Sequence, residues 1–303
     1  IFGAGGGGGG GGPEAWFNNI PACTRIWLGS TLVVTALVNL ELIKWHALDF
    51  NRWEDVIGQG SNGRAEAWRM LTCFLFAGKF GFGTIVGLHL MVQVSSRYET
   101  MGPICTRRIH LNPPGPEERP TEELQNNSRR SYSSPYYARG ETSDYSFALL
   151  FGMIGILITQ ILLIPKLPAF ITHNLYHRFF HRHLKFYVLY IWSKQHPQHR
   201  VNFFGVSLSA AYLPYAYILM GYAMNNGQGI PVDMLHGMFV GHVYFYLACI
   251  VPRVLGGRRT VLSTPVALVD LCNWLEGRGT PVGLDGRRDD GPILADLDGV
   301  IGG

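Results

Sequence analysis

The stretch MLHGMFVGHVYFYLACIVP, residues 234–252, carries no formal charge and lies between Asp233 and Arg253. A helix rises about 1.5 Å per residue, so a stretch of this length can cross the hydrocarbon layer of a bilayer. Gly237 and Gly241 stand four residues apart, on one helical face, where they let another backbone approach closely. His242 follows directly, and an ionisable group at membrane depth needs a partner or water. We therefore expect a membrane helix with tightly packed neighbours.

Other apolar runs supply these neighbours. The uncharged runs are residues 26–40, 80–96, 145–165 and 201–230, and a shorter apolar run at 186–192 would finish a span that begins near Leu167. The chain is 47% hydrophobic and only 15% charged, with a mean hydropathy of +0.11. This composition is typical of a polytopic membrane protein. We predict an all-α membrane helix bundle, with the run at 186–192 deciding between five and six spans.

Three segments have compositions unlike those of the spans. Residues 1–15 form a Gly-rich leader, and residues 266–303 form a Gly- and Asp-rich tail. Residues 101–141 are rich in Pro, Ser, Asn, Arg and Glu, and they have too few apolar side chains to form a core. We predict a disordered leader, a disordered cytosolic insert and a mostly disordered cytosolic tail around a membrane domain at residues 16–265.

The segment at residues 41–79 mixes tryptophan and phenylalanine with charged residues, a pattern typical of short helices that lie in the membrane interface. The distribution of lysine and arginine predicts the orientation, because cytosolic loops are enriched in them. With six spans and a cytosolic N-terminus, sixteen of these residues fall on the cytosolic side and nine on the other. Both termini are therefore expected in the cytosol.

Several motifs, taken in order, resemble the Derlin family. They are PEAWFNNIPACTR at 13–25, AWRMLTCFLFAGKFGFG at 67–83, SSRYETMG at 95–102, TSDYSFALLFG at 142–152, YIWSKQHPQHRVNFFG at 190–205 and GMFVGHVYFYL at 237–247. The resemblance covers most of residues 13–267. Any one of these motifs is a weak signal, whereas the ordered set is specific.

The resemblance implies a six-transmembrane rhomboid-like fold without protease activity in the membrane of the endoplasmic reticulum, or in a related membrane around a complex plastid. Derlins assist the retrotranslocation of misfolded proteins to the cytosol for degradation. The matching residues are the first-loop pair Trp68 and Arg69 and the sixth-helix glycines Gly237 and Gly241. Further polar candidates for a supporting role are Glu41, His89, Gln93 and His242. The expected partners are misfolded clients, membrane lipids, a ubiquitin ligase complex, an AAA unfoldase and further Derlin copies in a homo- or hetero-oligomer.

Two departures from the family pattern limit what the resemblance implies. The connection between the second and third spans is about forty residues long, and THNLYHRFFHRH at 172–183 looks like an insertion. The tail shows no match to the short glycine-containing motif by which some Derlins recruit the unfoldase. Direct binding of the unfoldase is therefore not implied.

For the mechanism, we expect local thinning of the bilayer. The short spans at residues 26–40 and 186–192 would create a mismatch with the lipid. A first loop that is partly inserted through Trp68 and Arg69 would deepen this distortion. The simpler interpretation of the same pair is an interfacial anchor that fixes helix tilt.

Two enzymatic alternatives remain at the level of sequence. Ser207 in GVSL with His242 as its base would make a rhomboid-type intramembrane serine protease, although a rhomboid protease carries its serine in the fourth span. A histidine-ligated membrane oxygenase is suggested by His173, His177, His181 and His183, with His196 and His199 farther on. The predicted bundle places these two groups on opposite sides of the membrane. We expect no cofactor and no metal. We also expect no nucleic-acid partner, because the arginines form no coherent stripe.

Overall fold

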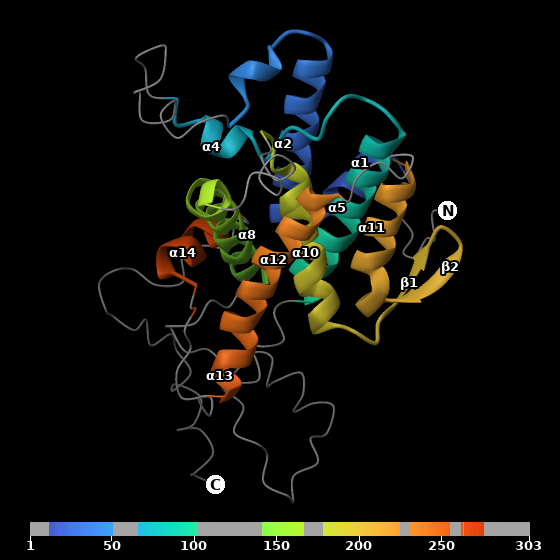
Figure 1. The fold of residues 1–303 in the computed structure, drawn as a ribbon, viewed down its shortest axis with the longest axis vertical. Helices are drawn as coiled ribbons and strands as arrows, with labels where there is room; N and C mark the ends of the chain where they lie inside the picture. Colours follow the sequence, from blue (N-terminus) through green and yellow to red (C-terminus); the bar gives the residue numbers. More distant parts are fainter. Residues whose placement is uncertain are drawn as a thin grey trace, which may run out of the picture.

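The computed structural model describes residues 12–50, 66–101, 141–166, 178–224, 231–254, 262 and 264–275, and these are mostly helical, as expected. Figure 1 shows the arrangement. The elements are α1 Pro13–Asn18, α2 Ala22–Asn39, η1 Trp45–Ala47, α4 Arg69–Thr72, α5 Phe82–Met101, α8 Glu141–Ile158, η2 Thr159–Leu163, η3 Ile164–Lys166, α10 His181–Gln195, β1 Arg200–Phe203, β2 Val206–Ser209, η4 Ala210–Tyr212, α11 Leu213–Met224, α12 Val232–Phe245, η5 Tyr246–Ile250, α13 Val251–Val254 and α14 Val266–Leu275.

Two helical stretches among the described residues are long and apolar enough to cross a bilayer: Ala22–Asn39, which is α2, and Thr142–Leu162. The other rods of the bundle are shorter or carry charges, with 15 residues in α10 and 12 in α11. These two helices have the length and composition of membrane spans. That the chain has six spans stays a prediction.

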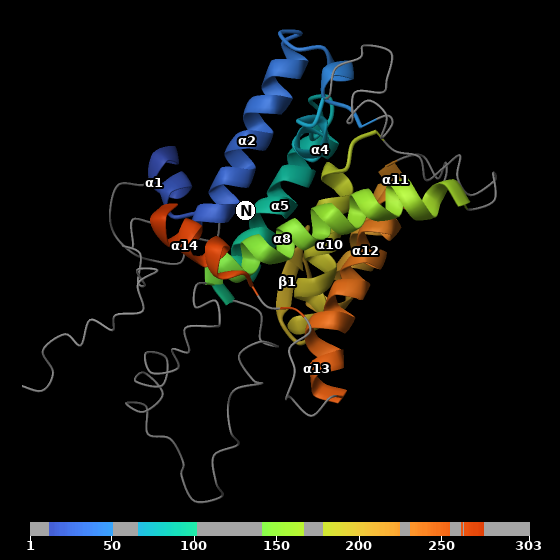
Figure 2. The same ribbon diagram turned by 90° about the vertical axis from the view of Figure 1, so that its left-hand side faces the viewer.

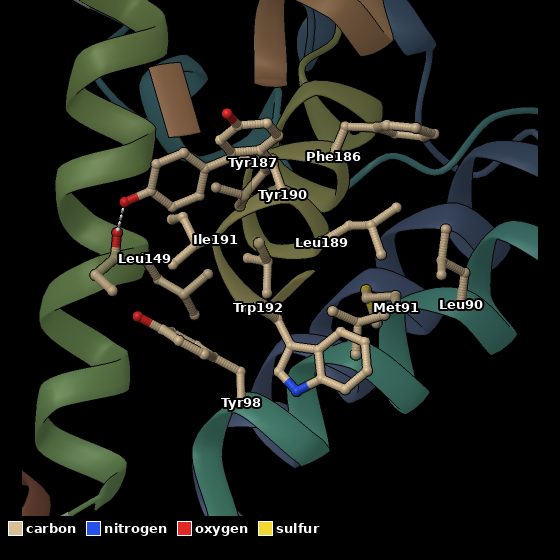
Figure 3. Packing of buried hydrophobic residues seen from close by; sticks show 14 of the residues in the cluster. Leu90, Met91, Tyr98, Leu149, Phe186, Tyr187, Leu189, Tyr190, Ile191 and Trp192 are labelled. Carbon is tan, nitrogen blue, oxygen red and sulfur yellow. Dashed lines mark hydrogen bonds between the residues drawn. The ribbon is translucent and has the colours of Figure 1, made fainter. Parts of the chain in front are cut away.

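Helix α10 is the centre of the bundle and packs against α5, α8, α11 and α12. Every side chain from His183 to Ser193 is buried. Figure 3 shows Tyr187, Ile191 and Trp192 of this helix between α8 and α5, with the Tyr187 hydroxyl donating to the Ala148 carbonyl oxygen at 2.7 Å. The apolar run at 186–192 is therefore core, shielded from lipid by its neighbours.

The charge-free stretch that predicted the last membrane helix forms a continuous helical rod. It begins in α12, passes through η5, a π-helical turn, and ends in α13. Helix α8 also continues into a π-helical turn, η2. Figure 2 shows α8 lying across α10 and α12 rather than alongside them. Such single π turns adjust the direction of side chains without ending a helix.

The all-α description was incomplete, because a two-stranded antiparallel sheet follows α10. Strands β1 and β2 are joined by a two-residue turn in which Phe204 and Gly205 both have positive φ, at 49° and 90°. Turns of this kind match the twist of the flanking strands, so hairpins favour them. The Asn202 side chain accepts a hydrogen bond from the Gly205 amide at 2.8 Å. Sequence reasoning missed this hairpin because it lay within a long uncharged run.

Two helices, α1 and α14, lie at the predicted domain boundaries. Helix α1 begins at Pro13, inside the segment expected to be a disordered leader, and α14 occupies the first ten residues of the expected tail. Helix α14 packs against α8, where the Thr264 hydroxyl donates to the Asp144 carboxylate at 2.8 Å. The Gly-rich residues 1–11, most of the insert at 102–140 and residues 276–303 lie outside the described part.

Candidate functional site

The Trp-Arg pair lies at the start of α4, in the loop that follows α2, and Arg69 organises this loop. Its Nη1 atom donates to the His46 carbonyl oxygen at 2.7 Å, to the Asp49 carbonyl oxygen at 2.9 Å and to the Asp49 carboxylate at 2.8 Å. Its Nε atom donates to the Glu66 carboxylate. A planar guanidinium can serve several acceptors at once, which an ammonium on a flexible stem does less well. Arg69 therefore clamps the two ends of the loop together.

The clamped loop is fastened to the beginning of α10. The buried Asp49 also pairs with Arg178 at 3.5 Å, and the Phe50 amide donates to the Arg178 carbonyl oxygen at 3.0 Å. The Phe180 amide donates to the Cys73 carbonyl oxygen at 2.8 Å. Burial raises the pKa of the Cys73 thiol above its ordinary value, so this thiol stays neutral and structural. The first loop thus has a fixed position on the bundle.

Trp68 differs from its neighbour because its side chain points outward. It is 53% exposed, and its indole nitrogen donates only a long hydrogen bond, 3.4 Å, to the Ala47 carbonyl oxygen. Other large apolar side chains of the same loop region are also exposed: Leu40, Leu42, Trp45 and Leu71. Arg69 supplies the rigidity of this loop and Trp68 part of its apolar surface, which is the arrangement of an interfacial segment.

The glycine pair lies where α12 meets α10. A Cβ atom on Gly237 would overlap the carbonyl oxygen of His183, and one on Gly241 would stand 3.0 Å from the Tyr187 carbonyl oxygen and 3.3 Å from the Tyr190 ring. The two backbones approach so closely that only hydrogen atoms fit between them. This is the small-residue seam that a four-residue glycine spacing produces.

The histidines near this seam are bound within the bundle. His242 Nδ1 lies 2.8 Å from the Tyr190 hydroxyl, and His236 Nε2 lies 2.6 Å from the Thr159 hydroxyl of η2. The ring of His183 meets that of His236 edge-on, with centroids 5.1 Å apart. His183 and His236 are buried and join α8, α10 and α12, as polar groups among packed membrane helices commonly do, whereas His242 is exposed beside Tyr190.

The structure keeps the two residues of the protease alternative apart. Ser207 lies in β2, opposite Asn202, and is exposed, while the Nδ1 atom of His242 is held by Tyr190. No hydrogen bond joins Ser207 to His242, and both residues belong to the described part. A nucleophile and its base need to lie within hydrogen-bond reach. The geometry therefore does not favour this alternative.

The histidines of the oxygenase alternative do not converge either. His181 and His183 begin α10, His196 and His199 lie beyond its other end, and His173 and His177 lie outside the described residues. A helix of 15 residues extends about 22 Å, which separates the two described groups far beyond any shared coordination. Within the described ranges, no group of three or more His, Cys, Asp or Glu side chains could hold a metal ion.

The remaining polar candidates occupy separate places. His89 and Gln93 form a hydrogen-bonded pair, 2.8 Å between their side-chain nitrogens, on the outer side of α5. Glu41 has a positive φ of 59° directly after α2, and its amide bonds to the Val38 carbonyl oxygen. A residue in this conformation ends a helix. Glu41 therefore terminates α2, and its side chain is exposed.

A buried polar network that the sequence analysis did not single out links α2, α5 and α8. The Glu99 carboxylate, 1% exposed, accepts hydrogen bonds from the Cys23 amide at 2.9 Å, the Thr24 amide at 2.8 Å and the Thr24 hydroxyl at 2.7 Å. Thr24 also bonds to Ser95, which bonds in turn to Tyr145. Glu99 thereby caps the open N-terminus of α2, where a negative charge is favourable. The signal was the glutamate in SSRYETMG, an acidic residue next to an apolar span.

Sequence comparison with known proteins identifies the family. The sequence profile of the Der1-like family matches residues 20–107 and 124–266, which include the first loop, the Glu99 network and the glycine seam. The chain belongs to the Der1-like family. Derlin-2.1 of Zea mays is 29% identical over 254 residues, which cover 83% of each chain. Derlin-1 of Homo sapiens is 29% identical over 273 residues, covering 87% of this chain and 82% of its own.

A third relative gives the same result. A probable derlin-2 homolog of Dictyostelium discoideum is 26% identical over 270 residues, which cover 89% of this chain and 85% of the homolog. The predicted Derlin resemblance is therefore confirmed, and with it a Derlin role in endoplasmic-reticulum-associated degradation. The gap in the family match, residues 108–123, falls within the predicted insert. The roles of individual residues in this Der1-like chain stay predictions.

Proposed function

We propose that this Der1-like chain is a non-catalytic, six-span, rhomboid-like component of the endoplasmic reticulum membrane. It eases misfolded polypeptides toward the cytosol by thinning the lipid around it. The observation that carries this proposal is the first loop: an exposed apolar surface that includes Trp68 is held rigidly on the bundle by Arg69. A rigid loop with apolar side chains displaces lipid at a fixed place, whereas a flexible loop would adapt to the bilayer.

The described part of α11 supports thinning. Within the described residues, which here stop at Met224, helix α11 and the preceding turn η4 contain 12 and 3 residues and extend about 24 Å together, against a hydrocarbon thickness of about 30 Å. The exposed side chains along this element are Tyr212, Tyr215, Leu219 and Tyr222. A short helix that faces lipid forces the bilayer to thin locally at a modest free-energy cost. Helix α10 does not contribute to the mismatch, because its neighbours shield it from lipid.

The proposed partners, orientation and membrane follow from this role. Misfolded clients and membrane lipids are the direct partners, and a ubiquitin ligase complex and an AAA unfoldase act on the client once it reaches the cytosol. Both termini face the cytosol, and further copies or relatives of the chain complete the assembly. The membrane is that of the endoplasmic reticulum, or its derivative around a complex plastid.

Trp68→Ala is expected to lengthen the half-life of a misfolded client while the protein itself stays folded. The indole is half exposed and holds one long hydrogen bond, so its removal costs the fold little, but the loop loses an exposed tryptophan. A pulse-chase measurement of the client in cells that carry only the variant gives the half-life. The matched control is Trp274→Ala, which removes a tryptophan that is 70% exposed on α14, outside the first loop. Equal client half-lives in the two variants would contradict the proposal.

Arg69→Lys tests whether the shape of the loop matters beyond its charge. Lysine keeps the positive charge but cannot serve the acceptors on His46, Asp49 and Glu66 together. We expect slower client degradation and faster amide exchange in residues 45–50, with the other helices unchanged. Normal client degradation together with a loosened loop would show that a rigid loop is not required.

Ser207→Ala is expected to leave client degradation unchanged, because among the described residues no base forms a hydrogen bond with Ser207. The purified protein should also remain unlabelled by a fluorophosphonate probe. Labelling that disappears in Ser207→Ala would instead establish a serine hydrolase.

A further inference from the structure

The hairpin of β1 and β2 has one apolar face and one polar face. Residues directly opposite each other share a face of a sheet, and the strand pairs are Val201 with Leu208, Phe203 with Val206, Arg200 with Ser209 and Asn202 with Ser207. The first two pairs form the apolar face and the last two the polar face. A hairpin of this kind fits a boundary between an apolar and an aqueous phase.

The tip of the hairpin carries an unusual residue. Phe204 has a φ of 49° and is 62% exposed, although this conformation is rare for bulky side chains, which leave it to glycine, asparagine or aspartate. Its backbone conformation is therefore strained. The Phe204 ring meets the Phe203 ring edge-on, with centroids 5.0 Å apart, but most of its surface stays exposed. Neither the turn nor the core accounts for an aromatic side chain at this place.

The hairpin lies against a helix with a lipid-facing stripe. The Phe203 ring packs edge-on against Tyr217 of α11, with ring centroids 4.9 Å apart, and Val201 is buried. Figure 1 shows the hairpin beside α11, at the periphery of the bundle. Tyr212 and Tyr215, at the beginning of the stripe on η4 and α11, are more than half exposed, as are Phe204 and Val206 of the hairpin. The hairpin is therefore packed against the helix that carries this stripe.

We propose that this hairpin is a membrane anchor, with Phe204 and Val206 inserted into the cytosolic interface of the bilayer beside α11. Aromatic side chains favour this level of the membrane. Arg200, on the polar face of the hairpin, lies where it meets anionic lipid headgroups. The anchor rests on the proposed placement of α11 in the bilayer. It fixes the position of the cytosolic end of this short helix relative to the lipid surface.

The experiment places a benzophenone analogue of phenylalanine at position 204, 207 or 219 of the full chain. Each purified variant is reconstituted in nanodiscs of phosphatidylcholine and phosphatidylserine, irradiated and analysed by mass spectrometry for phospholipid adducts. Position 219 on α11 is the reference for the proposed span, and position 207 on the polar face of the hairpin is the matched control. We expect phospholipid adducts at positions 204 and 219 and none at position 207.

Adducts at 219 without adducts at 204 would overturn the anchor and leave the span in place. The absence of adducts at both positions would overturn the placement of α11 and the anchor with it. In native membranes, adducts of position 204 with a protein instead of lipid would assign the hairpin to a protein partner and also overturn the proposal. Phe204→Asn, which suits the turn and keeps the hairpin, is expected to abolish the lipid adduct of a benzophenone at position 206.

Discussion

Gly237→Ala is expected to lower the free energy of unfolding by about 3 kcal/mol, at the upper end of the usual cost of overpacking. The added methyl group would overlap the backbone carbonyl of His183, which cannot rotate away as a side chain can. Helices α10 and α12 must then separate, and α10 is the element against which α5, α8 and α11 also pack. Thermal unfolding of the purified protein in detergent measures the loss.

Gly29→Ala is the matched control, since it also replaces a glycine inside a helix. Its nearest neighbour would be a side-chain atom of Phe17 at 4.0 Å, which is an ordinary contact. Alanine favours the helix by roughly 0.5–1 kcal/mol over glycine, so this variant should be slightly more stable than the parent protein. A loss of stability in Gly237→Ala together with a gain in Gly29→Ala would show that the backbones of α10 and α12 are in close contact at the glycine pair. A Gly237→Ala variant as stable as Gly29→Ala would show that the helices do not approach so closely.

Glu99→Gln is expected to destabilise the protein by about 2–3 kcal/mol, because buried donors that lose their acceptor cost about 1–3 kcal/mol each. The amides of Cys23 and Thr24 and the Thr24 hydroxyl all depend on the two carboxylate oxygens of Glu99. Glutamine keeps the volume but offers a single acceptor oxygen and no charge to the N-terminus of α2. Faster hydrogen exchange at the first amides of α2 would locate the effect there.

Glu14→Gln makes the same chemical change at an exposed glutamate in the first turn of α1. It should change the stability by less than about 1 kcal/mol, as is usual for a surface charge near a helix end. If Glu99→Gln were equally mild, water or another residue would have to satisfy the start of α2. The Glu99 network would then not be what joins α2 to α5.

The proposed function depends on both the glycine pair of α12 and the Glu99 cap of α2. The glycine seam and the Glu99 cap hold the helices in one arrangement, and Arg69 holds the first loop on it. The exposed apolar surfaces of α11 and of the first loop can thin the lipid only if their positions are fixed. Loss of a structural contact and loss of Trp68 should therefore differ in outcome. The first lowers the amount of folded protein, and the second lowers client degradation at a normal amount of protein.

The sequence determined those properties that depend on neighbours along the chain. Long apolar runs predicted helices such as α2 and the rod that contains Gly237 and Gly241, because the length of such a run sets whether a helix can span a bilayer. The four-residue spacing predicted which face of that rod would pack. The order of short motifs, from PEAWFNNIPACTR to GMFVGHVYFYL, indicated the Derlin family, which the family match confirmed.

Only the tertiary structure decided the contacts between distant residues. It placed the short run at 186–192 in the centre of the bundle, folded residues 200–209 into a hairpin, and brought Glu99 to the start of α2 and Arg69 to Asp49. It also separated Ser207 from His242, which the sequence had left as a candidate pair. Hydrophobic periodicity reports how apolar a segment is and which side is buried, but it does not report which segment lies opposite. That choice depends on the packing of all helices together.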